Sequence, residues 1–164
     1  MDRINKIIDN RQYRNLLKKN EEEEADRRFC THHFEHLLTV ARLTYILLLE
    51  EQYPFISREI AYAAALLHDI GRWQEYKSGE DHAESGSRLA KPILDAAGFD
   101  DSEQELIIKA IAQHRVKNDQ DRHRSPLSKA LGKADRFSRL CFKCSERANC
   151  KKLERQPHKE RLIY

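Results

Sequence analysis

Residues 57–72 read SREIAYAAALLHDIGR, and this stretch decides the fold class. Ser57 is a good helix cap, and the apolar run that follows from Ala61 to Leu67 has the length of a core helix. The run leads directly into His68 and Asp69. Apolar residues recur at helical spacing in nearly every other part of the chain, whereas no stretch alternates apolar and polar residues for long enough to form a strand. The sequence therefore predicts an all-α protein.

The length and composition fit one compact domain. The chain has 164 residues, of which 40% are hydrophobic and 35% are charged, with only 5 Gly and 4 Pro. This composition excludes collagen-like, low-complexity and disulfide-scaffold chains. A chain of this length builds one core, so we expect a single compact bundle of about six to seven helices.

Periodicity and capping residues place the individual helices. We expect helices over residues 2–19, 31–51, 57–67, 82–97, 102–114 and 126–135. The segments expected between them are an acidic, solvated helix end or linker at 21–24, a loop bracketed by Gly71 and Gly79, and a charged loop at 117–124. The division expected along the chain is an N-terminal helix with an acidic linker at 1–29, a main domain at 30–140, and a basic, cysteine-containing extension at 141–164.

Charge is distributed unevenly along the chain. Residues 1–114 contain 15 Lys and Arg against 21 Asp and Glu, whereas residues 115–164 contain 15 against 6. A basic segment of this density suits an anionic ligand, either a phosphorylated small molecule or a nucleic acid. A solvated surface with an uneven charge distribution is the alternative explanation.

The sequence predicts neither a signal peptide nor a membrane span. The first residues are already polar, and the longest uncharged apolar runs, at 43–49 and 60–67, have the length of core helices. We therefore expect a cytoplasmic protein with no membrane partner, whose four cysteines stay reduced. The sequence leaves the oligomeric state open.

Four histidines and two aspartates stand out because they lie near helix ends or in apolar helices. They are His36, His68, Asp69, His82, His114 and Asp135. An ionisable group in an apolar helix is costly unless it is paired or bound to a cation. A single such histidine is usually a hydrogen-bonded core residue, but the whole set is more than hydrogen bonding requires. Its nitrogen and oxygen donors suit Fe, Mn, Co, Ni or Zn better than Ca, and six ligands exceed one tetrahedral site. The set predicts one or two divalent transition-metal ions, with two adjacent ions the better interpretation.

The arrangement of these residues resembles the H…HD…D signature of the HD-domain superfamily of metal-dependent phosphohydrolases. Three contexts carry the resemblance: HLLTVA at 36–41, AALLHDIGR at 64–72 and KADR at 133–136. By this resemblance, one metal takes His36, His68, Asp69 and Asp135 as ligands. The second metal shares Asp69 and adds His82 and His114, as in the dinuclear branches of the superfamily.

The resemblance also implies the chemistry. No Ser, Cys or Thr lies in a recognisable nucleophile motif, so a metal-activated water is the expected nucleophile. The expected reaction cleaves a phosphoester or phosphoanhydride bond of a small phosphorylated molecule, most plausibly a nucleotide or dinucleotide, with Asp69 and Arg72 as catalytic residues. Arg72 follows the HD turn, where many relatives carry Lys, and is expected to contact a substrate phosphate.

Other residues are weaker candidates for substrate contact. Arg115, Lys133, Arg136 and Arg139 are expected to contact phosphate or, equally, to be ordinary surface charges. His32 lies four residues before His36, on the same face of the expected helix, and is assigned substrate contact or support of a ligand. At the position of His33, one subset of HD domains carries Asp instead. His123 and His158 are expected to be solvated.

Three cysteines follow the signature with the spacing Cys141-x2-Cys144-x5-Cys150. Three thiolates are one short of a structural zinc site, and either Cys30 or His158 could supply the fourth ligand. An iron–sulfur cluster is a less favoured interpretation of this spacing, and packing of reduced thiols is the simplest alternative.

Two other functions fit the same residues. HD-fold diiron oxygenases use the same six ligands, so ligand identity does not separate an oxygenase from a hydrolase. A nucleic-acid-binding regulatory module on an HD scaffold would use the basic extension, although a scaffold has no need of all six ligands.

Overall fold

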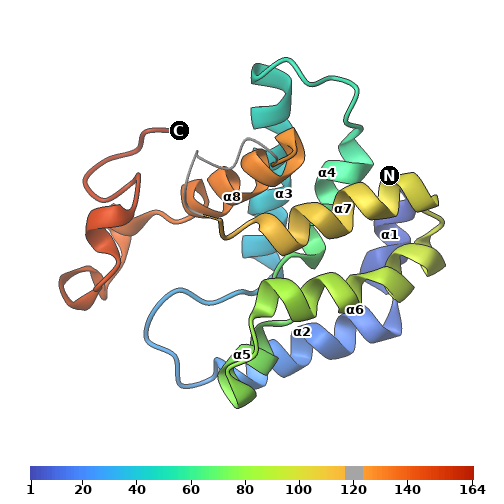
Figure 1. Cartoon of the computed structure of the whole chain (residues 1–164). Helices are drawn as coiled ribbons and strands as arrows, with labels where there is room; N and C mark the ends of the chain where they lie inside the picture. The colour runs from blue at the N-terminus through green and yellow to red at the C-terminus, as the bar shows by residue number, and fades with distance from the viewer. Residues whose placement is uncertain (117–123) are drawn as a thin grey trace.

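The computed structural model describes residues 1–116 and 124–164, over which the chain is helical and contains no strand (Figure 1). The α-helices are α1 (Asp2–Asp9), α2 (Arg11–Glu23), α3 (Phe34–Glu50), α4 (Arg58–Leu67), α5 (Arg72–Ser78), α6 (His82–Ala97), α7 (Asp101–Gln113) and α8 (Pro126–Phe137). Short 3₁₀ turns follow at Cys141–Lys143, Arg147–Asn149 and Leu153–Arg155. The all-α prediction is confirmed. The loop expected at 117–124, with His123, lies outside the described residues except for Arg124.

The single helix expected over residues 2–19 is two helices. Asn10 has an extended backbone, and its side chain accepts hydrogen bonds from the backbone amides of Gln12 and Tyr13, so it ends α1 and caps α2. Helix α2 then continues to Glu23, which means that most of the expected acidic linker is helical. Glu24 is buried rather than solvated, being only 3% exposed.

Three other boundaries differ from the prediction for local reasons. The loop expected after Gly71 is helix α5, which ends at Gly79 in a left-handed conformation with φ 76°. Helix α3 begins at Phe34, so His32 precedes it. Asp100, not Ser102, caps α7, because Asp100 and Glu103 form a reciprocal capping box.

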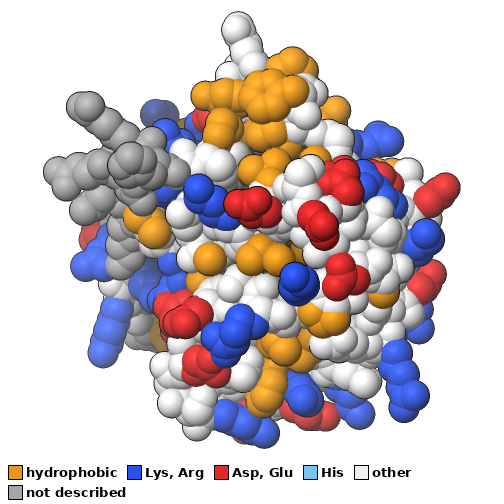
Figure 2. Space-filling view, turned by 45° about the vertical axis from the view of Figure 1, so that its right-hand side comes forward, with side chains coloured by type: hydrophobic (Ala, Val, Ile, Leu, Met, Phe, Trp, Pro, Cys, Tyr) orange, Lys and Arg blue, Asp and Glu red, His pale blue; other side chains and the backbone are white. Residues whose placement is uncertain are grey.

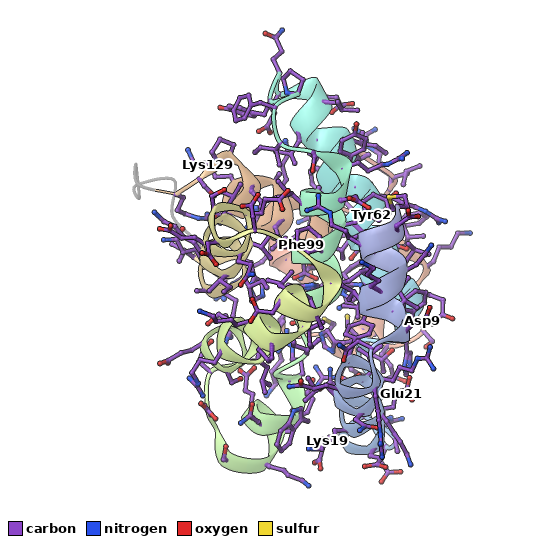
Figure 3. All side chains as sticks on the ribbon, turned by 90° about the vertical axis from the view of Figure 1, so that its right-hand side faces the viewer. Asp9, Lys19, Glu21, Tyr62, Phe99 and Lys129 are labelled. Carbon is purple, nitrogen blue, oxygen red and sulfur yellow. The ribbon has the colours of Figure 1, made fainter. Side chains whose placement is uncertain are left out.

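Helix α4 forms the centre of the core. Seven of its ten residues are buried, and it packs against α3 on one side and α7 on the other. Helix α3 also packs against α8, and α6 packs against α7. In Figure 3 Phe99, which is 4% exposed, lies in the connection between α6 and α7, whereas the exposed Asp9, Glu21 and Lys129 lie at the periphery. The C-terminal end of α4 is thus surrounded by the helices that carry the other candidate ligands.

Two glycines allow these helices to approach closely. A Cβ atom on Gly71 would lie 2.7 Å from both the backbone nitrogen of Gly86 and the backbone oxygen of His82. A Cβ atom on Gly132 would lie 2.4 Å from the backbone oxygen of His114. The turn after α4 therefore rests directly on α6, and α8 rests on the end of α7.

The C-terminal extension lies beside α8, at the left of Figure 1, away from α1. Within residues 141–164 only Cys141 and His158 are buried. The expectation that His158 is solvated is wrong, because its side chain has no exposed surface and its ring lies 5.5 Å from that of Phe137.

The outer surface is a mixture of charged and apolar side chains. Figure 2 shows acidic and basic groups interspersed, with apolar side chains gathered at the end where α3 leads into α4. Phe55 in that connection is 75% exposed. Among the described residues, no helix has the length and apolar character needed to cross a membrane.

Candidate metal centre

Five structural elements bring the six candidate ligands together. His36 comes from α3, His68 and Asp69 from the end of α4, His82 from the start of α6, His114 from the end of α7 and Asp135 from α8. Their ligand atoms form two groups in which all atoms lie within 4.8 Å of one another. One group is His36, His68, Asp69 and Asp135; the other is Asp69, His82 and His114.

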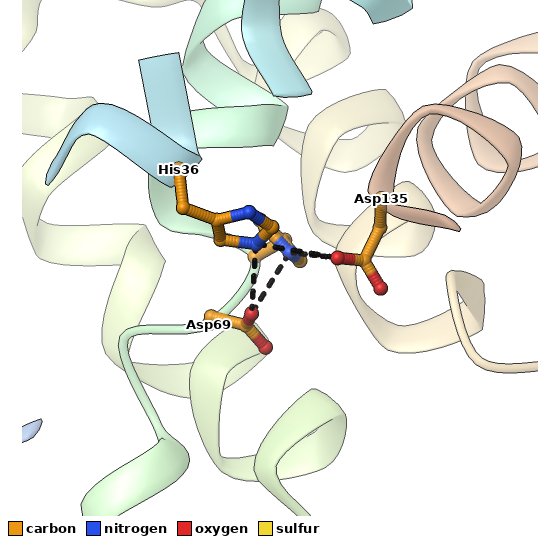
Figure 4. A group of neighbouring side chains, drawn as sticks. His36, Asp69 and Asp135 are labelled. Carbon is orange, nitrogen blue, oxygen red and sulfur yellow. Dashed lines mark ion pairs between the residues drawn. The ribbon is translucent and has the colours of Figure 1, made fainter. Parts of the chain in front are cut away.

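The first group is centred on Asp69 and Asp135 (Figure 4). The Nε2 atom of His68 lies 3.0 Å from Oδ2 of Asp69, and the Nε2 atom of His36 lies 3.2 Å from Oδ1 of Asp135. His36 Nε2 is also 3.9 Å from Oδ2 of Asp69. Two imidazole nitrogens and two carboxylates thus converge on one point.

The second group uses the other oxygen of Asp69. The Nε2 atom of His82 lies 3.1 Å from Oδ1 of Asp69 and 3.3 Å from Nε2 of His114. Because the two oxygens of Asp69 face different groups, this carboxylate belongs to both. The structure therefore has the geometry of two adjacent sites with one shared ligand.

Hydrogen bonds at Nδ1 orient three of the imidazoles. His68 and His114 each place Nδ1 2.7 Å from a backbone carbonyl oxygen, of Ala65 and Ile111 respectively. His82 places Nδ1 against the carboxylate of Glu75. A ring that donates from Nδ1 presents the lone pair of Nε2 inward, which is how histidine ligands of metals are usually held.

Two buried atoms in the centre, Nε2 of His68 and Oδ2 of Asp69, face each other at 3.0 Å, but neither forms a hydrogen bond. Buried polar atoms are nearly always satisfied, and an unsatisfied pair in a dry core is costly. Both atoms are metal-ligand types and both belong to the first group. A divalent transition-metal ion would satisfy them, so the residues fit the metal that the sequence predicted.

The charges of His36, His114 and Asp69 also suit a cation, whereas, against the effect of burial, the neighbouring carboxylate of Asp69 raises the pKa of His68. Burial lowers the pKa of His36 to about 4 and that of His114 to about 3, so both imidazoles are neutral near pH 7. Burial alone would raise the pKa of Asp69, but Arg72 and His68 outweigh it and hold that pKa well below its usual value. A neutral imidazole and an ionised carboxylate are the forms that bind metal.

A buried asparagine fixes the turn that carries Asp69. The Nδ2 atom of Asn20 donates to the backbone oxygen of Asp69 at 2.9 Å, and its Oδ1 atom accepts from the backbone amide of Trp73 at 2.8 Å. Asn20 is only 1% exposed. Sequence reasoning missed this residue, although a polar residue on the inner face of an otherwise apolar helix surface is a detectable signal.

His32 reaches the centre by a route that the sequence did not predict. It lies ahead of α3, so it does not share a helical face with His36. The carboxylate of Glu24 accepts from its backbone amide at 2.7 Å and contacts its Nδ1 atom. The Nε2 atom of His32 then lies 3.7 Å from Oδ2 of Asp69. Tyr76 also donates to Glu24, at 2.7 Å, which helps to fix this buried carboxylate.

A cleft of about 420 Å³ opens beside the candidate ligands His114 and Asp135. Its lining residues are Arg72, His114, Arg115, Gly132, Asp135, Arg136, Lys152, Arg155 and Gln156. The Nε atom of Arg72 lies 3.0 Å from Oδ1 of Asp69, and Arg115 pairs with Asp81 at 2.8 Å. Lys152 and Arg155 come from the C-terminal extension and were not among the predicted contact residues, because only the fold brings that extension to the cleft.

The other two predicted cations lie elsewhere. Lys133 pairs with Glu51 at 3.2 Å and does not line this cleft. Arg139 lines a different cleft, donates to the backbone oxygen of Thr31 at 2.7 Å and lies 2.9 Å from Nε2 of His36. Arg139 thus contacts a candidate ligand without facing the cleft.

Comparison with known proteins agrees with this geometry. The family model of the HD domain matches residues 33–140. The chain belongs to the HD-domain family. An HD-domain structure that is 34% identical, described as a predicted HD superfamily hydrolase from an uncultured Thermotogales bacterium, superposes with a TM-score of 0.57, covering 76% of this chain and 66% of that one.

Sequence relatives extend the comparison. An uncharacterised protein of Clostridium beijerinckii is 37% identical over 150 residues, which is 92% of both chains. Bifunctional uridylyltransferase/uridylyl-removing enzymes of Rhodopseudomonas palustris and Erythrobacter litoralis are 37% and 36% identical over 59 and 58 residues. Those matches cover 36% and 35% of this HD-domain chain but only 6% of each enzyme.

Proposed function

We propose that this HD-domain protein is a metal-dependent hydrolase that cleaves a phosphoester or phosphoanhydride bond of a small phosphorylated molecule, most plausibly a nucleotide or dinucleotide. One observation carries the proposal: the two ligand groups border a cleft lined by five cationic side chains. They are Arg72, Arg115, Arg136, Lys152 and Arg155. Divalent ions bound by these ligands would acidify a water molecule and neutralise charge on phosphoryl oxygens.

The residues around the ligands have separate tasks in this proposal. Asp69 is held ionised and is positioned through its backbone by Asn20. Arg72 is mostly buried, with a side chain 17% exposed, and it lines the cleft while bonding Asp69 and Glu75. A guanidinium held in this way is preorganised to donate to a phosphate oxygen with two N–H groups.

The names of relatives support the reaction class. The solved relative is described as a predicted hydrolase, and the two partly matching enzymes are named for removal of a uridylyl group, which is a nucleotide moiety. The cationic lining favours a phosphorylated substrate. The cleft is also of the size that small-molecule ligands occupy.

The test is a hydrolysis screen over nucleoside mono- and diphosphates and dinucleotides with Fe, Mn, Co, Ni and Zn, on protein purified without chelator, in which both inorganic phosphate and nucleotide products are measured. On the best substrate and at saturating metal, because Arg72 also bonds the candidate ligand Asp69, Arg72→Ala should slow turnover by about 10²–10³-fold, the usual cost of losing one transition-state donor. Arg72→Lys should recover part of the rate because it keeps the charge. Arg58→Ala is the matched control, since Arg58 is exposed at the start of α4.

The proposal fails if no phosphorylated compound turns over without dioxygen with any metal tried. It also fails if Arg72→Ala releases phosphate at the wild-type rate. If the ferrous protein consumes dioxygen and the rate is unchanged in Arg72→Ala, the centre would be assigned to an oxygenase instead.

A further inference from the structure

The four cysteines of the chain line one cleft, although they come from opposite ends of the sequence. This second cleft has a volume of about 410 Å³ and lies between the segment ahead of α3 and the C-terminal extension. All four cysteines are free thiols, and Cys30, Cys141, Cys144 and Cys150 all contribute to the lining. Cys141 is the buried member of the set, and its thiol interacts electrostatically with the other three.

The extension that carries three of them has almost no core of its own. It consists of 3₁₀ turns closed by local hydrogen bonds, such as Cys144 N–H to the Cys141 carbonyl at 3.2 Å and Leu153 N–H to the Cys150 carbonyl at 3.1 Å. Between 141 and 164 only Cys141 and His158 are buried. A segment with so little apolar burial is usually held by disulfides or by a metal.

His158, the alternative fourth ligand, is engaged elsewhere. Its Nδ1 atom accepts from the backbone amide of Ile163 at 3.0 Å, and the residue does not line the cysteine cleft. Cys30 does line it, beside Arg28 and Arg139. Arg147 lines the same cleft. These guanidinium groups oppose the negative charge that four thiolates would bring together.

We propose that Cys30, Cys141, Cys144 and Cys150, which line one cleft, bind one metal centre through four thiolates, either a zinc ion or an iron–sulfur cluster. Both kinds of centre take four cysteine ligands.

The centre has a consequence for the proposed active site. Lys152 and Arg155 follow Cys150 closely in the sequence and line the other cleft, beside Asp135. A centre that fixes the extension therefore also fixes two of the five cations of that cleft. This consequence rests on the proposed function, whereas the metal site itself does not.

The test uses the full chain purified without chelator and without oxygen. Iron, acid-labile sulfide and zinc are measured in the wild type and in Asp69→Ala, because removal of Asp69 takes a shared ligand from the other centre. Asp69→Ala should retain the four-thiolate centre, measured either as one zinc per chain or as iron with acid-labile sulfide. Cys30→Ser and Cys144→Ser should each lose that metal, and their extensions should be cleaved faster by trypsin. Ser145→Ala, an exposed neighbour, is the matched control and should match the wild type.

The outcomes separate the parts of the proposal. One zinc per chain in Asp69→Ala, lost in both cysteine variants, would support the four-thiolate site as a zinc site, and iron with sulfide lost in the same way would support it as a cluster. Full metal retention in Cys30→Ser would overturn the four-ligand arrangement. Absence of iron and zinc from Asp69→Ala would overturn the site altogether. None of these readings depends on phosphate release, so failure here and failure of the proposed function are distinguishable.

Discussion

Substitution of Gly71 by alanine should weaken both the fold and the metal centre. Gly71 has φ −90°, which alanine tolerates, so the effect comes from space alone. The added methyl group would lie 2.7 Å from the backbone nitrogen of Gly86 and the backbone oxygen of His82, and 2.3 Å from Oγ of Ser85. The Ser85 hydroxyl can rotate away, but the backbone of α6 cannot, so the turn and the helix must separate.

The expected loss of stability follows from that contact. Overpacking of a tightly packed site costs about 1–3 kcal/mol, which for a chain of this size lowers the melting temperature by roughly 2–12 °C. The same separation moves Asp69 away from His82, whose Nε2 atom lies 3.1 Å from its Oδ1 atom. We therefore expect the second group to lose metal affinity more than the first. Thermal unfolding of the metal-free protein and metal titration measure the two effects.

Gly79→Ala is the matched control because this substitution strains the backbone without causing a steric clash. Its Cβ atom would meet nothing within 4 Å, but its φ of 76° is left-handed. It should lose about 1 kcal/mol through backbone strain and leave metal binding unchanged. Normal affinity of the second group in Gly71→Ala would refute the claim that the contact between the turn and α6 sets the ligand geometry.

Three further predictions concern the ligands and their support. Asp69→Ala should lose both ions of the His/Asp centre, whereas His82→Ala should lower bound metal from about two towards one; full occupancy in His82→Ala would mean that only the first group binds. Glu75→Gln should weaken the second ion by about 10–100-fold, the usual cost of losing a partner of a ligand, and Glu84→Gln on exposed α6 surface should have no effect. In the metal-free protein, the lowered pKa of His114, about 3, makes the unfolded chain bind more protons between about pH 3 and 6.5, so stability falls as pH falls through this window. His114→Gln should flatten that dependence in denaturant titrations, and an unchanged slope would contradict the assignment.

The fold class and the set of candidate ligands could be predicted because their signals are local. Apolar periodicity and caps such as Ser57 depend on residues a few positions apart. The signature around His68 and Asp69 is equally local, and its order along the chain carried the resemblance to the HD family. The boundaries that were wrong involve competition between neighbouring caps: Asn10 divides one periodic stretch into two helices, and Asp100 precedes the expected cap by two residues.

The supporting residues could not be predicted because their roles depend on long-range packing. Glu24 is the last of four consecutive glutamates, and nothing local distinguishes it as the one that is buried against His32. The sequence predicts a loop around Glu75, and only the formation of α5 places this residue beside His82. Lys152 reaches the first cleft only because the extension folds back beside α8. Contacts of this kind have no periodicity in the sequence.

The ligand count also predicts the order in which the two ions bind. The first group offers four ligands, of which two are carboxylates, whereas the second offers three and has only the shared Asp69 as a carboxylate. Two negative charges attract a dication more strongly than one, and four ligands leave fewer positions for water. The first ion should therefore bind more tightly, and by neutralising Asp69 it should weaken the second. Titration of the metal-free protein should show two steps, with the weaker step absent in His82→Ala. A single step of two ions with equal affinity would contradict this order.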